Sequence, residues 1–136
     1  MAQRDFLQDV NFKGAVKLNG TAIGATADEI NQIGDVSAFQ ETIQAAGALT
    51  LAKRFHKLAL PGAGAVTLAA PSANELGMIK VIEMTVDNGD VTLSLANCVG
   101  QSSGTTATFN DVRDQLVLIG GTDRWIVIKE RGIALA

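Results

Sequence analysis

The sequence predicts a mainly β protein, with an N-terminal arm carrying short helices in residues 1–47 and an antiparallel β-sandwich or jelly-roll-like knob in residues 48–136. Two observations lead to this fold class. The longer helical patterns are confined to the arm, whereas β-favouring runs separated by turn residues fill the knob. The turns recur about every eight to twelve residues without βαβ alternation, which is typical of antiparallel sandwiches.

The arm combines a β-favouring stretch with two helix starts. Residues 10–18 lead into Asn19-Gly20, a dipeptide that tolerates positive φ and favours a tight turn. Capping boxes at residues 26–29 and 37–40 then predict two short helices, ended by Gly34 and Gly47. Apolar residues recur there at helical spacing: Ile30, Ile33, Val36, Phe39, Ile43 and Ala46. Helices this short are marginal alone, so we expect them to lie either on the knob or against identical helices around a symmetry axis.

The knob consists of strands separated by recognisable turns. Pro61-Gly62-Ala63-Gly64 is a turn, and Asp87-Asn88-Gly89-Asp90 predicts a hairpin. Residues 71–75 predict a capped helical turn that ends at Gly77. The predicted strands are residues 49–55, 56–60, 65–70, 78–86, 91–96, 105–109, 115–119 and 125–129.

Composition places the chain among globular proteins. Hydrophobic residues make up 47% and charged residues 18% of 136 residues. The longest apolar stretches are too short to cross a bilayer, and the N-terminus lacks the apolar core of a secretory signal, so we expect synthesis in a cytoplasm. A single cysteine cannot form an internal disulfide, so stability depends on packing or on partner chains.

Charge is concentrated in the arm. Residues 1–47 carry three basic and six acidic side chains, whereas residues 48–136 carry eight of each, so the net charge of −3 lies in the arm. No basic run is available to release counterions from a phosphate backbone. We therefore expect no nucleic-acid partner.

An enzymatic site is not favoured by the sequence. Residues 100–104, Gly-Gln-Ser-Ser-Gly, match the letters of a nucleophile elbow, which requires a following helix and a later histidine. Here a predicted strand follows, and the only histidine, His56, comes earlier, so we interpret the motif as a turn. His56 is expected at the surface or half-buried, and one histidine with one cysteine cannot supply a zinc site. We expect no enzymatic activity, no cofactor and no metal.

Two other features could bind ligands. Asp87, Asn88 and Asp90 offer the oxygen ligands that calcium prefers, but the same residues are favoured in turns. Trp125 is either a core or inter-subunit anchor or a platform for stacking sugars. With one tryptophan, no tyrosine and five phenylalanines, the chain is poor in the aromatics that sugar-binding modules display. Cys98 is interpreted as a small buried hydrophobe.

One segment of the arm is similar to a known family. Residues 26–36, T-A-D-E-I-N-Q-I-G-D-V, resemble the T-A-x-E-L-N-x-L-D-G segment near the start of trimeric modules in bacteriophage head-decoration and head- or tail-fibre proteins, although Gly34-Asp35 reverses the usual order. The stretch 14–21 before it, and the series 66–71, 87–93 and 118–125 after it, resemble the adjoining strand and the distal β-domain of those proteins. The resemblance extends over about residues 14–128 and rests mostly on turn chemistry in a particular order.

The resemblance implies a homotrimer attached to a capsid or tail. We expect a virion protein at the capsid surface, a decoration or head-fibre subunit that binds the major capsid protein or another virion protein, without a membrane or nucleic-acid partner. The alternatives are a short tail-fibre or tip subunit and a carbohydrate-binding adhesion module. Capsid-contact candidates are apolar residues in a mostly polar arm: Phe6, Leu7, Val10 and Phe12. Trimer-interface candidates are those of the helical stripes: Ile30, Ile33, Val36, Phe39 and Ile43.

Overall fold

The chain divides into two compact units, Met1–Gly34 and Asp35–Ala136. The computed structural model describes residues 17–18, 21–22, 39–99 and 105–136. Residue 47, where we placed the boundary, lies inside the second unit: the strand of residues 40–43 precedes it, and the strand of residues 47–48 begins there.

The first unit contains a small antiparallel pair. Strand β1 (Lys17–Leu18) pairs with β2 (Thr21–Ala22), and Leu18 lies opposite Thr21. This register joins the strands through two residues, which fits the chain reversal predicted from Asn19-Gly20. The first predicted helix, near residues 26–34, lies outside the described residues.

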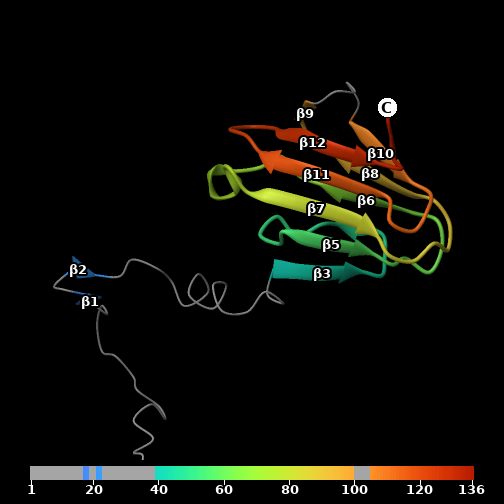
Figure 1. Ribbon diagram of the computed structural model, residues 1–136, viewed down its shortest axis with the longest axis horizontal. Coiled ribbons are helices and arrows are strands. Elements are labelled where there is room, and N and C mark those ends of the chain that lie inside the picture. The colour runs from blue at the N-terminus through green and yellow to red at the C-terminus, as the bar shows by residue number, and fades with distance from the viewer. Residues whose placement is uncertain (1–16, 19–20, 23–38, 100–104) are drawn as a thin grey trace, which may run out of the picture. The chain divides into compact units, whose positions relative to one another are not determined.

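The second unit is mainly β, as predicted, and consists of two sheets around one hydrophobic core (Figure 1). The six-stranded sheet has the order β3-β5-β7-β11-β12-β9, and the five-stranded sheet has the order β13-β10-β8-β6-β4. The strands of the first sheet are β3 (Gln40–Ile43), β5 (Phe55–Leu58), β7 (Ile79–Met84), β11 (Gln115–Gly120), β12 (Trp125–Arg131) and β9 (Cys98–Val99). Those of the second are β4 (Gly47–Ala48), β6 (Gly64–Leu68), β8 (Val91–Leu95), β10 (Thr106–Phe109) and β13 (Ala134–Leu135).

The core lies between the two sheets. Successive side chains on a strand point to opposite faces, so alternate residues of each strand enter the core. Both sheets contribute fully buried residues: Leu58, Ile82, Leu116, Leu118 and Trp125 from one, and Val66, Leu93, Ala107 and Phe109 from the other. The core is therefore a shared layer of the kind that holds β-sandwiches together.

The prediction of antiparallel pairing is wrong for five of the nine strand pairings described in the second unit. Strands β3, β5 and β7 run parallel to one another, and so do β4, β6 and β8, which makes both sheets mixed. From β3 to β8 the chain alternates between the two sheets. Each pair of consecutive strands, one in each sheet, forms one full turn of the chain, and successive turns stack on one another. Parallel pairing normally needs long crossovers, and here a strand of the opposite sheet provides each crossover.

The hairpin predicted at residues 87–90 is a turn between the two sheets. It joins β7 of the six-stranded sheet to β8 of the five-stranded sheet, which do not pair. Gly89 has φ +130°, and a Cβ there would lie 2.7 Å from the backbone nitrogen of Ala63. Turn residues encode a change of direction, and they do not specify whether the next strand pairs with the last one or crosses the core.

The second predicted helix, over residues 37–46, is also wrong where the structure describes it. Residues 40–43 form β3 and residues 47–48 form β4. Strand β3 pairs with β5, and this pairing points Glu41 and Ile43 inward beside His56 and Leu58. An isolated short helix gains too few hydrogen bonds to repay nucleation, whereas β3 gains a ladder and core contacts.

The capped turn predicted at residues 71–77 is confirmed. Ser72 caps the 3₁₀ turn η2 (Ala73–Glu75), and the backbone N–H of Ser72 donates to Glu75 Oε2 at 2.8 Å. Gly77 follows at φ +75°. The turn is fixed to the six-stranded sheet because Gly77 N–H donates to the carbonyl of Gly120 at 2.8 Å.

Candidate functional site

The outer side of the six-stranded sheet carries two neighbouring rows of mainly apolar residues. Cross-strand register places Ile79, Ile119, Ile126 and Val99 side by side in one row, on β7, β11, β12 and β9. A second row contains Phe55, Val81 and Val117, with Gln40 on β3 and Lys129 on β12 at its two ends. We call the seven apolar residues of the two rows, together with Ile128 on β12, the apolar face.

Several of these side chains are open to solvent. The exposed fraction is 54% for Ile79, 41% for Ile126 and 52% for Ile128. Among the described residues seven large hydrophobic side chains are exposed, and four of them belong to the apolar face. Such clustering is unlike scattered surface hydrophobes and is typical of interaction surfaces.

Leu76 extends the apolar face at one end. Its side chain is 63% exposed, and it lines two shallow hollows of about 510 and 320 Å³. The first also includes Arg124 and Ile126, and the second also includes Arg54 and Ile79. Arg124 is paired with its neighbour Asp123 at 2.7 Å. The polar side chains that line the hollows are Thr122, Asp123 and Arg124 in the first and Arg54 and Asn74 in the second.

The outer side of the five-stranded sheet has a different character. Apart from Ala65 on β6, the outward residues in the central strands β6, β8 and β10 carry hydroxyl groups: Thr67, Thr92, Ser94, Thr106 and Thr108. Register places them next to one another, as Thr106 opposite Ser94 and Thr108 opposite Thr92. We call these five residues the hydroxyl face.

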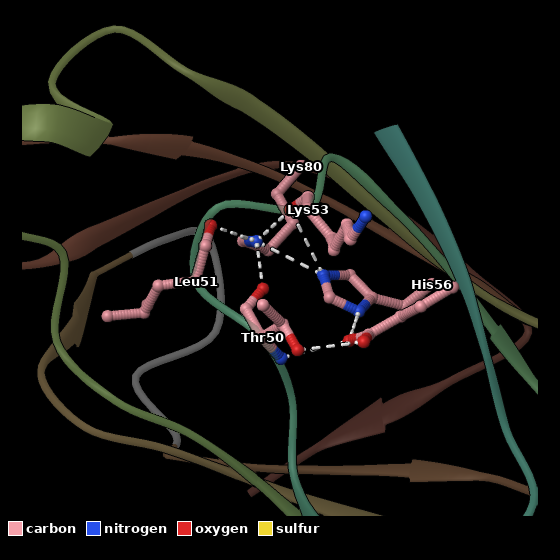
Figure 2. Close-up of polar contacts among 6 residues, drawn as sticks. Thr50, Leu51, Lys53, His56 and Lys80 are labelled. Atoms are coloured by element: carbon pink, nitrogen blue, oxygen red, sulfur yellow. Dashed lines mark hydrogen bonds and ion pairs between the residues drawn. The ribbon is translucent and has the colours of Figure 1, made fainter. Parts of the chain in front are cut away.

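A buried polar network lies beneath the apolar face. Lys80, between the outward Ile79 and Val81 of β7, points inward and is completely buried. Its ammonium group lies at the centre of the network in Figure 2 and donates to the carbonyls of Leu51 (2.9 Å), Thr50 (3.4 Å) and Lys53. The ammonium also lies 5.4 Å from the centre of the Trp125 ring, a cation–π distance.

His56 completes this network from β5. Its Nε2 lies 3.1 Å from the Lys80 ammonium, and its Nδ1 lies 2.8 Å from Glu41 Oε1 on β3. The Nδ1 contact is close, but its angle falls short of a regular hydrogen bond. Glu41 in turn accepts hydrogen bonds from the backbone N–H and the hydroxyl of Thr50, at 2.9 and 2.8 Å.

Burial determines the charges in the network. Desolvation, followed by the nearby Lys80 charge, lowers the pKa of His56 to about 4, so its imidazole is neutral at pH 7. A neutral ring with its proton on Nδ1 accepts from Lys80 at Nε2 and faces Glu41 with its N–H. Desolvation also lowers the pKa of Lys80, to about 8, and the carboxylates of Glu41 and Glu75 partly oppose this shift.

The network is suited to structural support. The side chains of His56 and Lys80 are both 0% exposed, so a substrate in solvent has no route to them. Lys80 instead satisfies carbonyls of the loop that carries the chain from β4 to β5. This arrangement corrects two expectations: His56 is fully buried, and residues 49–54 form a loop that wraps the lysine, with β5 starting at Phe55.

The structure describes two of the nine contact candidates from the sequence. Ile43 lies on β3 and packs against the core of its own chain. Phe39 precedes β3, is half-buried, and lies under the Arg54 guanidinium at 4.9 Å. The remaining candidates lie outside the described residues: Phe6, Leu7, Val10, Phe12, Ile30, Ile33 and Val36.

The possible ligand sites can also be located. Asn88 donates to the carbonyl of Leu60 at 3.1 Å, and Asp87 accepts from the N–H of Gly89 at 3.2 Å, both as turn contacts. Trp125 is fully buried and donates to the carbonyl of Ala69 at 2.8 Å, so it is not accessible to a sugar ring. Cys98 is half-buried at the core margin, and burial raises the pKa of its thiol.

Two further features concern the described part of the chain. No group of three or more metal-ligating side chains is gathered there in a metal-binding arrangement. None of the helices found in that part has the length and apolarity to cross a membrane. The Gly-Gln-Ser-Ser-Gly segment, residues 100–104, lies outside the described residues.

The apolar face was missed from the sequence, although a signal for it exists. In Ile79-Lys80-Val81-Ile82 and in Trp125-Ile126-Val127-Ile128, apolar residues occupy both inward and outward positions. A β-sandwich strand with one solvent-exposed side normally alternates apolar and polar residues. Strands that are apolar on both sides therefore indicate a covered outer face.

Comparisons with known proteins leave the chain without an assigned family. No protein-family model matches it, and no curated protein matches it significantly.

Proposed function

We propose that this chain is a structural protein of a bacteriophage virion, a capsid decoration or head-fibre subunit that binds the assembled capsid as a homotrimer. Its role is mechanical and non-enzymatic, and its place is the capsid surface. The proposal combines the resemblance of residues 26–36 to trimeric phage modules with the surface chemistry of the β unit.

The observation that carries the proposal is the apolar face. A row of isoleucines and valines across four strands, with Ile79 and Ile126 exposed, is costly to leave in water and is suited to contact with other protein surfaces. The polar groups that could have suggested catalysis, His56 and Lys80, are buried and hold a loop in place. Both features favour an assembly role over a reaction.

A decoration protein stabilises a shell by binding only its assembled form. At a concentration one hundred times the dissociation constant, such binding stabilises the assembled state by about 2.7 kcal/mol per site. The apolar residues Phe6, Leu7, Val10 and Phe12 are our candidates for this contact, because a mostly polar, acidic arm has little other reason to carry them.

The direct test is rebinding. Shells of the phage that encodes the chain, assembled without it, are mixed with purified protein and sedimented. We expect saturable co-sedimentation and a higher melting temperature of the shells. Protein that stays in the supernatant at all concentrations contradicts the proposal.

A truncation separates the arm from the β unit. Removal of residues 1–12 is expected to abolish co-sedimentation while leaving the melting temperature of the isolated protein unchanged. A lowered melting temperature with retained binding assigns these residues to the core of their own chain and contradicts a capsid-contact role.

A further inference from the structure

The apolar face has a charged margin that resembles the rim of a protein interface. The row after Phe55, Val81 and Val117 consists of polar residues aligned across four strands: Lys57, Glu83, Gln115 and Arg131. Protein interfaces typically have an apolar centre and a polar rim. Lys57 also lies over the Phe55 ring, 5.9 Å from its centre, so its apolar stem covers the boundary between the two rows.

We propose that copies of this chain assemble through the apolar face, which packs against the same face of neighbouring copies. The inference rests on the homotrimer of the proposed function and assigns a surface to it. In a closed assembly, the isoleucine rows are buried between copies and the hydroxyl face points to solvent.

The size of the apolar face suits such an interface. The six strands have two to seven residues each, and with about 3.3 Å per residue and a spacing of about 4.8 Å the whole outer side of the sheet covers roughly 500 Å². This is the area of a flat sheet, and protruding side chains increase the accessible area. The outer side therefore approaches the ~800 Å² that each partner buries in a standard stable interface. The apolar face is part of that side, so an interface between copies also includes the polar residues at its margin.

Charge favours a second copy as the occupant. In the polar row at the margin, Glu83 lies between two basic residues. Lys57 is on the adjacent strand β5, and Arg131 is two strands away on β12. The outer side thus carries one acidic residue, Glu83, and three basic residues, Lys57, Lys129 and Arg131, and a copy related by rotation can bring its Glu83 against one of these bases. A surface that matches its own copies is what closed symmetric assemblies require.

Rigidity adds to this argument. The residues of the apolar face lie on strands of one sheet, and the strands β5, β7 and β12 are fixed from behind by His56, Lys80 and Trp125. Association therefore orders few new backbone segments, and ordering is a main cost of binding. The hydroxyl face offers no comparable apolar area to a partner.

The test introduces one charge at the centre of the apolar face. Ile126→Glu and Ile79→Glu each change an exposed residue, so the fold of a single chain tolerates them. Thr67→Glu, at an exposed position of the hydroxyl face, is the matched control. Native mass by light scattering across a dilution series is the readout, with circular dichroism to verify that each variant is folded.

We expect wild type and Thr67→Glu to have the mass of several chains. Ile126→Glu and Ile79→Glu should raise the dissociation constant at least a hundredfold and have the 14.2 kDa mass of one folded chain. A wild-type mass of one chain overturns the inference. Folded glutamate variants that keep the wild-type mass overturn it equally.

Shell co-sedimentation of the same proteins distinguishes this inference from the proposed function. An assembly that dissociates with Ile126→Glu but never binds shells supports the interface and contradicts the capsid role. A monomer that binds shells, and loses binding with Ile126→Glu, makes the apolar face a capsid-binding surface and overturns self-assembly.

Discussion

The two sheets of the β unit have similar inner sides and opposite outer sides. Inside, both contribute fully buried aliphatic residues to one core. Outside, the six-stranded sheet presents Ile79, Ile119 and Ile126 in a row, whereas the five-stranded sheet presents Thr92, Ser94 and Thr106. Because the core is formed by the inner sides, the stability of one chain does not need the outer isoleucines. Their presence points to a partner surface, which we take to be another copy.

Neighbouring residues of β7 allow the sharpest test of this separation. Lys80→Met removes the donor from three partly buried carbonyls, and we expect the free energy of unfolding to fall by roughly 2–4 kcal/mol. Ile79→Met, one position away on the outer side, should change the stability of the single chain by less than about 0.5 kcal/mol. Urea unfolding at matched low concentration measures both. If the two variants lose equal amounts of unfolding free energy, the inner and outer sides of β7 do not differ in their contribution to stability, which contradicts the account.

Lowering the pH should destabilise the network of His56 and Lys80 beneath the apolar face, without affecting the hydroxyl face. Unfolded His56 takes up a proton near pH 6.5, whereas the folded chain binds it only near pH 4, so protons favour the unfolded state between these values. The expected loss of unfolding free energy is about 1.5 kcal/mol between pH 6.5 and 5.

The only histidine of the chain is His56, so a variant can isolate its contribution to this pH dependence. His56→Gln keeps an acceptor for Lys80 without titrating in this range, and its stability should be nearly constant from pH 6.5 to 5. Urea unfolding at several pH values compares the two proteins. A slope that persists in His56→Gln assigns the pH dependence to other groups.

The turn between the two sheets is the next most sensitive point. Gly89→Ala adds a Cβ only 2.7 Å from the backbone of Ala63, at a φ that favours glycine, and should cost about 1–2 kcal/mol. Gly62→Ala, in the facing turn, meets its nearest atom at 4.0 Å and should change stability by less than about 0.5 kcal/mol. Thermal unfolding compares them, and an unaffected Gly89→Ala would mean that the turn adjusts freely.

The smallest effect on single-chain stability is expected when one residue is exchanged between the two outer faces. Ile128→Thr and Thr67→Ile both change exposed residues, so each should alter the free energy of unfolding by less than about 0.5 kcal/mol. They should differ in association: Ile128→Thr weakens it and Thr67→Ile does not. Identical dilution profiles for the two variants would remove the distinction between the faces.

Local chemistry predicted the local structure well. Ser72 and Glu75 form the capping box that their spacing indicates, and Gly77 ends that turn with positive φ. The predicted strands at residues 105–109, 115–119 and 125–129 correspond to β10, β11 and β12, because alternation records which side of a strand is buried.

Pairing and burial of polar groups were not predictable in the same way. Parallel pairing of β3, β5 and β7 depends on which sheet each turn leads into, and turn residues such as Asn88-Gly89 suit both outcomes. The burial of Lys80 depends on carbonyls contributed by residues 50–53, about thirty positions earlier. Such contacts form only after distant segments meet, so a local pattern does not contain them.

The central claim is that the outer isoleucines join copies of this chain, and the native mass of three proteins tests it most directly. Wild type, Ile126→Glu and Thr67→Glu are compared by light scattering at one concentration. The account predicts that wild type and Thr67→Glu share the mass of an assembly while Ile126→Glu has that of a single folded chain. One common mass for all three would contradict it.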